Sequence, residues 1–143
     1  MNYVLDMYRQ MFDRVKRGYN KGAFCNAKPI LLISLIDYVV FIKENKFRWG
    51  NRLLEDLYKT NFSDLDTAKL TPLWKPFYYM SSEPFYSLVW EQEPDAKELA
   101  RPSGKTLRTY LSYSKFDDEL WELMQDAENR DYLRKSIIKT YFS

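Results

Sequence analysis

Residues 29–42 read PILLISLIDYVVFI and form the longest apolar stretch of the chain, with Ser34 and Asp37 as its polar members. Pro29 suits the first turn of a helix, because the N–H that proline lacks has no intrahelical partner there. The apolar residues cover most of a helical circumference, and the stretch is too short to cross a bilayer comfortably. We therefore predict a central, buried helix that starts at Pro29 and ends before the polar residues 44–46.

Other segments carry the apolar spacing of helices that cover such a core. Residues 3–15 are apolar at three- and four-residue steps, which predicts a helix that ends near Gly18. Asn51 is a suitable N-cap for a helix before the polar, irregular residues 61–69. In the same way Asp117 precedes a further helix, and a last helix includes residues 132–141.

Aromatic residues are concentrated in residues 77–80 and 85–90, separated by Ser81-Ser82-Glu83-Pro84. This pattern predicts a β-hairpin with Phe77 and Met80 facing the core. Residues 18–22 and 91–105 are predicted to be loops, and residues 106–113 fit a strand or a helix equally well. The predicted fold is α+β: one mainly helical domain over residues 1–143, with a β-hairpin in a winged-helix-like arrangement.

The composition excludes several classes of chemistry. The chain has 143 residues, 45% of them hydrophobic, with one cysteine, Cys25, and no histidine. Ser-His-Asp and Cys-His sites, HExxH zinc sites and the HNH motif all need imidazole, and one thiol makes neither a disulfide framework nor a zinc site. We therefore expect no catalytic motif, no cofactor and no metal site, although a nuclease that uses carboxylates and a divalent metal stays open. The start of the chain lacks a secretory signal, which predicts a cytoplasmic protein without a membrane span.

The net charge is only +2, but the basic residues are unevenly distributed. Residues 1–30 hold six basic and two acidic residues, a local excess of four positive charges. A second basic group consists of Lys97, Arg101, Lys105, Arg108 and Lys115. Such clusters indicate a polyanionic partner, because phosphate contacts are made by cations.

Three segments of the chain resemble a known family. Residues 28–37, KPILLISLID, resemble the "hKPxLLLxxLD" segment at the head of many HNH restriction endonucleases. Residues 76–80 with 85–88 resemble their "PFwxL…dgfWhL" segment, and residues 116–142 resemble "lDxeLwxLLxdxxxRxxLrxxLlxxYF". The order and spacing agree over nearly the whole chain. The chain is thus similar to the N-terminal, sulfur-binding-domain-like module of McrA-like HNH endonucleases.

This resemblance implies a DNA-recognition module of a bacterial restriction, and hence phage-defence, system. Modules of this kind recognise phosphorothioate-modified DNA and direct a C-terminal HNH nuclease domain, which is absent from this chain. The implied partners are double-stranded DNA and either that nuclease domain or a separate nuclease. In the family, residues before the Lys-Pro pair and around the Pro-Phe pair contact the modified backbone. Ala27 and Lys75 stand where the family often has a histidine and an aromatic residue.

Together, the charge pattern and the resemblance give a set of candidate DNA-binding residues. A sulfur atom is larger, more polarisable and a weaker hydrogen-bond acceptor than oxygen, so a selective site needs apolar surface beside cations. The start of the helix after Lys28 adds unpaired N–H groups suited to phosphate. The candidates are Arg14, Lys16, Arg17, Lys21, Asn26, Lys28, Lys75, Pro76, Tyr78 and Tyr79.

Two other interpretations stay open. The basic segment can be an ordinary solvated loop, and exposed Tyr and Trp side chains can form a protein-interaction or homodimer surface that binds no DNA. Arg130 and Arg134, four residues apart, fit either a second phosphate row or a charged surface.

Overall fold

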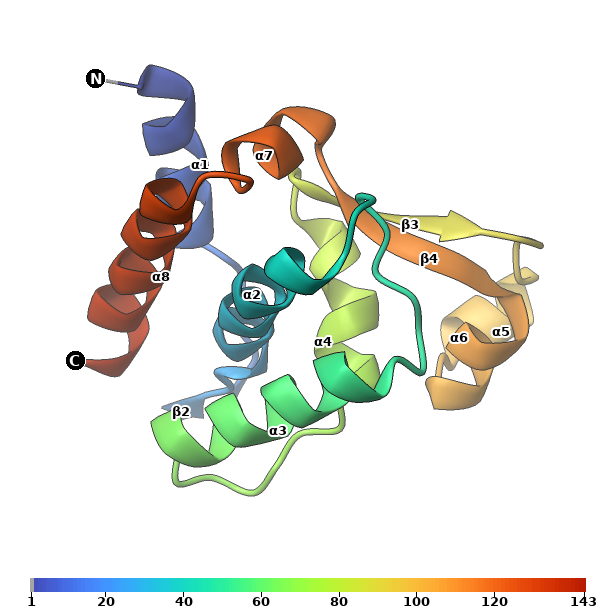
Figure 1. Ribbon diagram of the computed structural model, residues 1–143. Helices are drawn as coiled ribbons and strands as arrows, with labels where there is room; N and C mark the ends of the chain where they lie inside the picture. Colours follow the sequence, from blue (N-terminus) through green and yellow to red (C-terminus); the bar gives the residue numbers. More distant parts are fainter. Residues whose placement is uncertain (1) are drawn as a thin grey trace.

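Within residues 2–143, which the computed structural model describes, the chain forms eight α-helices and two small antiparallel sheets (Figure 1). The predicted α+β class with mainly helical content is confirmed. The helices are α1 Tyr3–Phe12, α2 Ala27–Tyr38, α3 Arg52–Leu65, α4 Trp74–Tyr79, α5 Ala96–Ala100, α6 Gly104–Tyr110, α7 Asp118–Leu123 and α8 Ala127–Phe142. The strands are β1 Tyr19–Asn20, β2 Ala23–Phe24, β3 Tyr86–Trp90 and β4 Leu111–Phe116, and short 3₁₀ turns cover Val39–Phe41 and Met80–Ser82.

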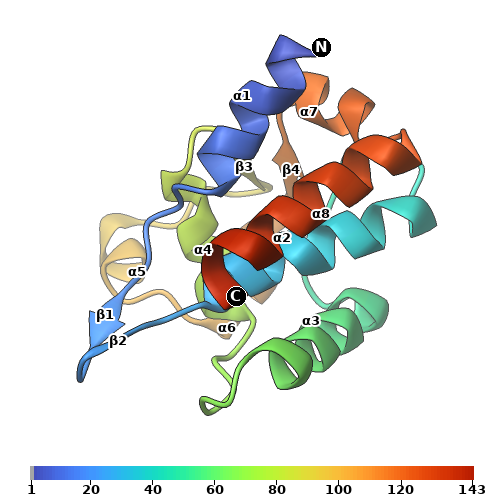
Figure 2. The same ribbon diagram turned by 90° about the vertical axis from the view of Figure 1, so that its left-hand side faces the viewer.

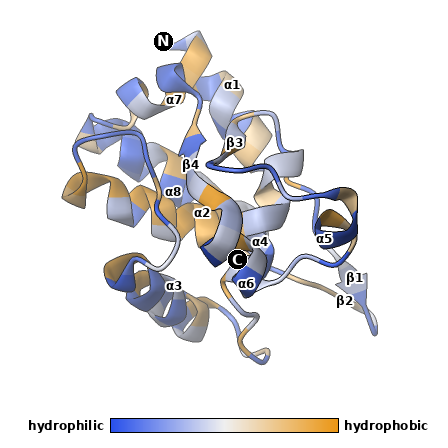
Figure 3. Ribbon diagram, turned by 90° about the vertical axis from the view of Figure 1, so that its right-hand side faces the viewer, coloured by the Kyte–Doolittle hydropathy of each residue, from blue (hydrophilic) through white to orange (hydrophobic). Residues whose placement is uncertain are grey.

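Helix α2 is the centre of the molecule, as the sequence predicts. Ten of its twelve residues are buried, so it has no solvent-exposed face. It packs against α3, α4 and α8 (Figures 1 and 2), and it stands out as hydrophobic in Figure 3. The helix starts at Ala27, two residues before the expected start, because Pro29 occupies its first turn and needs no N–H there. None of the helices within the described residues has the length and apolarity that a bilayer crossing requires.

The flanking helices depart from the sequence prediction at their ends. Helix α1 stops at Phe12 rather than near Gly18. Asn51 caps α3 as expected, its Oδ1 accepting a hydrogen bond from the Leu54 N–H at 3.0 Å. However, α3 continues to Leu65 into a segment predicted to be irregular, because Asn61 and its neighbours face the core.

The largest correction concerns residues 77–90, where the expected hairpin does not form. Residues 74–79 are helix α4, and β3 pairs instead with β4, with Tyr86 opposite Phe116. The partner strands are separated by residues 91–110, which hold α5 and α6 rather than a single loop. Phe77 and Met80 are nevertheless buried, as expected. Residues 106–113 change from helix to strand at Leu111, so both alternatives are partly right.

A small hairpin occurs where a loop was expected. Strands β1 and β2 pair antiparallel, with Tyr19 opposite Phe24. The turn between them consists of Lys21 and Gly22, both at positive φ (51° and 81°), a conformation that favours glycine at the second position. This hairpin projects from the helical body beside the start of α2 (Figure 2).

The contact between α4 and β3 gives a test of the packing. The Tyr86 hydroxyl is buried and donates a hydrogen bond to the Phe77 carbonyl oxygen at 2.6 Å. Replacing Tyr86 with phenylalanine leaves that carbonyl without its partner, so we expect the free energy of unfolding to fall by about 1–2 kcal/mol. Urea denaturation measures the change. Tyr19→Phe, at an exposed tyrosine, is the control and should change stability little; an equal loss in both variants would contradict this role of Tyr86.

Candidate functional site: a cationic pocket at the start of α2

A pocket of about 390 Å³ opens where the start of α2, the β1–β2 hairpin and α4 meet; we call it pocket A. Six of the ten candidate residues line it: Lys16, Arg17, Lys28, Lys75, Pro76 and Tyr79. Gly18, Cys25, Ala27 and Thr71 complete the lining. Four cations therefore share one pocket with apolar surface, and its lining includes no carboxylate.

Three elements bring these residues together. The chain leaves α1, passes through Lys16 and Arg17 into the hairpin, and returns to enter α2 at Ala27. A hydrogen bond of 2.7 Å from the Cys25 N–H to the Gly18 carbonyl oxygen closes the base of the hairpin. Helix α4 approaches from the other side, because its buried Phe77 holds it against the core. Ala27, Pro76 and the ring of Tyr79 supply the apolar surface of the pocket.

Arg17 is held by neighbours from two distant parts of the chain. Its guanidinium lies over the Phe24 ring, 4.2 Å from the centroid, and over the Tyr141 ring at 4.8 Å. It also donates a hydrogen bond to Asn26 Oδ1 at 2.9 Å. Burial raises the pKa of Tyr141 to about 12, so the Tyr141 hydroxyl stays protonated at neutral pH. Arg17 thus joins the hairpin to α8 while its charge has no carboxylate partner within residues 2–143.

Lys28 differs from Arg17, because its charge is already balanced. Its Nζ lies 3.2 Å from Glu83 Oε2 and 3.1 Å from Ser82 Oγ. The same Glu83 oxygen accepts a hydrogen bond from the Lys16 backbone N–H at 3.1 Å. Glu83 is 7% exposed, so this ion pair is largely desolvated, and removing one partner would leave a buried charge. Lys28 therefore ties the start of α2 to the segment after α4.

Lys16 and Lys75 are the two solvent-exposed cations of pocket A. Both side chains are exposed, and neither takes part in a salt bridge within the described residues. Tyr79, four residues after Lys75 at the end of α4, is 48% exposed. Lys75 also lies 5.9 Å from the ring of its neighbour Trp74. The outer part of the pocket therefore combines exposed ammonium groups with an aromatic ring.

The remaining four candidates lie outside the lining of the pocket. Asn26 stands behind it and orients Arg17. Lys21 is in the turn at the tip of the β1–β2 hairpin, and Arg14 is exposed before it. Tyr78 is not part of the pocket lining, and its ring centroid lies 6.5 Å from that of Trp90 and 5.0 Å from that of Tyr79. The structure thus brings six of the ten candidate residues together in one pocket and leaves the other four outside its lining.

The C-terminal arginines have structural partners. Arg134 Nε and Nη2 bind the two carboxylate oxygens of Asp37 at 2.9 and 3.2 Å. Arg130 donates to the Met124 carbonyl oxygen at 2.7 Å. Of the two alternatives for this pair, a phosphate row is therefore disfavoured.

Sequence reasoning missed two residues that shape pocket A. Glu83 stood in a segment interpreted as a turn, and no local pattern marks it as the partner of Lys28, 55 residues away. Tyr141 was placed only on the last helix, and its contact with Arg17 depends on how α8 packs. Both are long-range contacts, which periodicity and charge counts do not reveal.

No protein-family model matches the chain, and no curated protein matches it.

The stacking of Arg17 leads to a test of how the hairpin is held. Lysine keeps the charge but lacks the planar guanidinium, so Arg17→Lys should loosen β1 and β2. Losing one cation–π contact, worth about 0.5–1 kcal/mol, should speed hydrogen exchange of the Cys25 N–H about two- to fivefold. NMR measures this exchange, with Arg14→Lys as the control at an exposed arginine. Unchanged exchange in Arg17→Lys would show that the hairpin holds its position without these contacts.

Proposed function

We propose that this chain is a DNA-recognition module in which pocket A holds one backbone phosphate, or its phosphorothioate counterpart, of double-stranded DNA. The observation that carries the proposal is the meeting of Lys16, Arg17 and Lys75 with the apolar surface of Pro76 and Tyr79 in one pocket. A phosphate needs only the cations. The apolar surface beside them is what a backbone carrying sulfur would use.

The charges of the pocket support a phosphate ligand. Glu83 balances Lys28, so the charges of Lys16, Arg17 and Lys75 remain uncompensated. Contacts of this kind set affinity and register on the duplex, and they carry no sequence information themselves. Selectivity then has to come from other surfaces of the pocket.

Pro76 and Tyr79 are the residues suited to that selectivity. A sulfur atom placed against them loses little hydration, because sulfur is a weak hydrogen-bond acceptor. An oxygen atom in the same place would give up hydrogen bonds to water, which costs free energy. The other non-bridging oxygen can still face Lys16 or Lys75. The pocket therefore offers different surroundings for the two kinds of backbone.

The resemblance to the recognition modules of McrA-like HNH endonucleases supports a role for this activity in a bacterial restriction system. In that setting the chain binds DNA and contributes no cleavage chemistry, and an HNH nuclease domain or a separate nuclease acts on the bound DNA. The absence of histidine from the chain is consistent with this division of labour.

Duplex binding with and without phosphorothioate tests the proposal by fluorescence anisotropy at several salt concentrations. Lys75→Glu should weaken binding to both duplexes about tenfold or more and reduce the slope of log K against log salt by about 0.9 or more. Tyr79→Ala should mainly reduce the preference for the phosphorothioate duplex. Both positions are exposed, so neither change removes a core contact.

Lys43→Glu is the matched control. Lys43 is also exposed, but it lies beyond the end of α2 opposite to pocket A. This variant should bind like the unaltered chain. If the unaltered chain binds neither duplex even at roughly 50 mM salt, the proposal fails. A concentration-dependent dimer that binds no DNA would support the protein-interaction alternative instead.

A further inference from the structure

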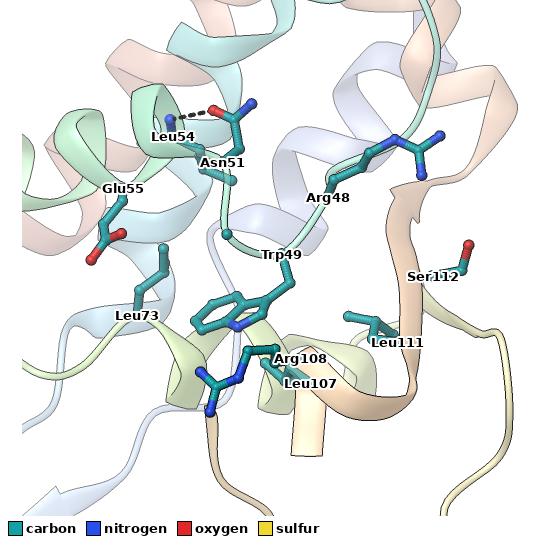
Figure 4. A pocket seen from close by; sticks show the side chains of 11 residues that line it. Arg48, Trp49, Asn51, Leu54, Glu55, Leu73, Leu107, Arg108, Leu111 and Ser112 are labelled. Carbon is teal, nitrogen blue, oxygen red and sulfur yellow. Dashed lines mark hydrogen bonds between the residues drawn. The ribbon is translucent and has the colours of Figure 1, made fainter. Parts of the chain in front are cut away.

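A second pocket, pocket B, lies between the loop before α3 and the turn from α6 into β4 (Figure 4). Its volume is about 490 Å³, within the roughly 300–1,000 Å³ range of small-ligand sites. It shares no lining residue with pocket A, so an inference about it does not depend on the proposed function.

Trp49 forms a fixed aromatic wall of pocket B. Its ring meets Phe77 edge-on, with 5.3 Å between the ring centroids. Gly104 lies close to the same indole, at a distance where an added Cβ would be 3.8 Å from Cζ2. Because Trp49 is half-buried, part of the ring stays open to the pocket. A planar ligand would therefore find a wall that is already in place.

Two arginines from different elements line pocket B. Figure 4 shows Arg108, on α6, beside the indole, whereas Arg48 lies farther from it, with its guanidinium 5.8 Å from the centroid of the Tyr113 ring. Both are exposed, and neither forms a salt bridge within residues 2–143. Glu55, the carboxylate in the lining, is already paired with Lys59 at 3.2 Å. Pocket B therefore carries two arginine side chains that have no carboxylate partner within the described residues.

This combination limits the chemistry of the ligand. A simple anion would gain nothing from the indole and from the apolar surface of Leu107 and Leu111. A purely apolar ligand would leave two guanidinium groups without partners. A planar aromatic group that carries a phosphate satisfies both, because base–aromatic stacking and arginine–phosphate contacts are both favourable.

We propose that pocket B binds one nucleotide unit, with its base against Trp49 and its phosphate at Arg108. The unit is either a free mononucleotide or an unpaired nucleotide of a nucleic-acid strand. In duplex DNA the bases are stacked on one another, so a paired base does not reach such a wall.

NMR titration of the ¹⁵N-labelled chain tests this with dAMP, an eight-residue oligo-dT strand and inorganic phosphate. The indole N–H of Trp49 is the reporter. Either dAMP or the oligonucleotide should shift the Trp49 signal at a concentration at least about tenfold lower than the concentration of inorganic phosphate that is needed for the same shift. The reason is that stacking on the ring adds to the phosphate contact. Arg108→Ala should weaken binding about tenfold, the effect of losing a charged hydrogen bond. Arg52→Ala, at an exposed arginine outside the pocket, should change it less than about twofold.

Comparing dAMP with the oligonucleotide distinguishes a free nucleotide from an unpaired nucleotide of a strand. Equal binding of dAMP and the oligonucleotide points to a free nucleotide, whereas tighter binding of the oligonucleotide points to an unpaired strand. No shift of the Trp49 signal, equal binding of phosphate, or an equal loss in Arg52→Ala would each overturn the proposal. The Cys25 amide reports on pocket A in the same spectra, so the two sites succeed or fail separately.

Discussion

The near-complete burial of α2 is the constraint on which the other elements depend. With ten of its twelve residues buried, the helix needs partners on every side, and α3, α4 and α8 supply them. Its two charged residues, Lys28 and Asp37, therefore lie near its two ends. Each is paired with an ion from another element: Lys28 with Glu83 and Asp37 with Arg134. The burial of the helix thus also determines where charges must be matched, and pocket A forms at one of these ends.

Local signals in the sequence were sufficient for α2, for the cap of α3 and for the α+β class. They failed at residues 77–90, and the reason is physical. Helix α4 has only six residues, too few to show a helical period, and its aromatic residues also favour strands. Strand β3 pairs with β4 across residues 91–110, so no turn near β3 marks its partner. In both cases tertiary packing determines the structure, and a single segment does not contain that information.

The candidate site likewise has a part that the sequence predicts and a part that depends on tertiary packing. Lys16, Arg17 and Lys28 lie close in sequence around the start of α2, so their proximity could be predicted from the chain alone. The approach of Lys75 and Tyr79 was implied only by the family resemblance. What each cation does could not be predicted, because Arg17 is held by Tyr141 and Lys28 by Glu83, both far along the chain. Charge counting treats these four cations as equal, whereas their contacts separate those that hold the fold from those that are free to bind.

Helix α4 is the structural link between the two pockets. Residues on its outer face, Lys75 and Tyr79, line pocket A, while Leu73 just before it lines pocket B. A helix this short is not stable by itself in water, so tertiary contacts must hold it. Phe77 provides them: it is buried, it packs edge-on against the Trp49 ring of pocket B, and its carbonyl oxygen accepts a hydrogen bond from the Tyr86 hydroxyl. A change at Phe77 would therefore disturb both pockets together, whereas changes of exposed lining residues act on one pocket at a time. For this reason the functions of the two pockets can be separated only with variants of the exposed residues.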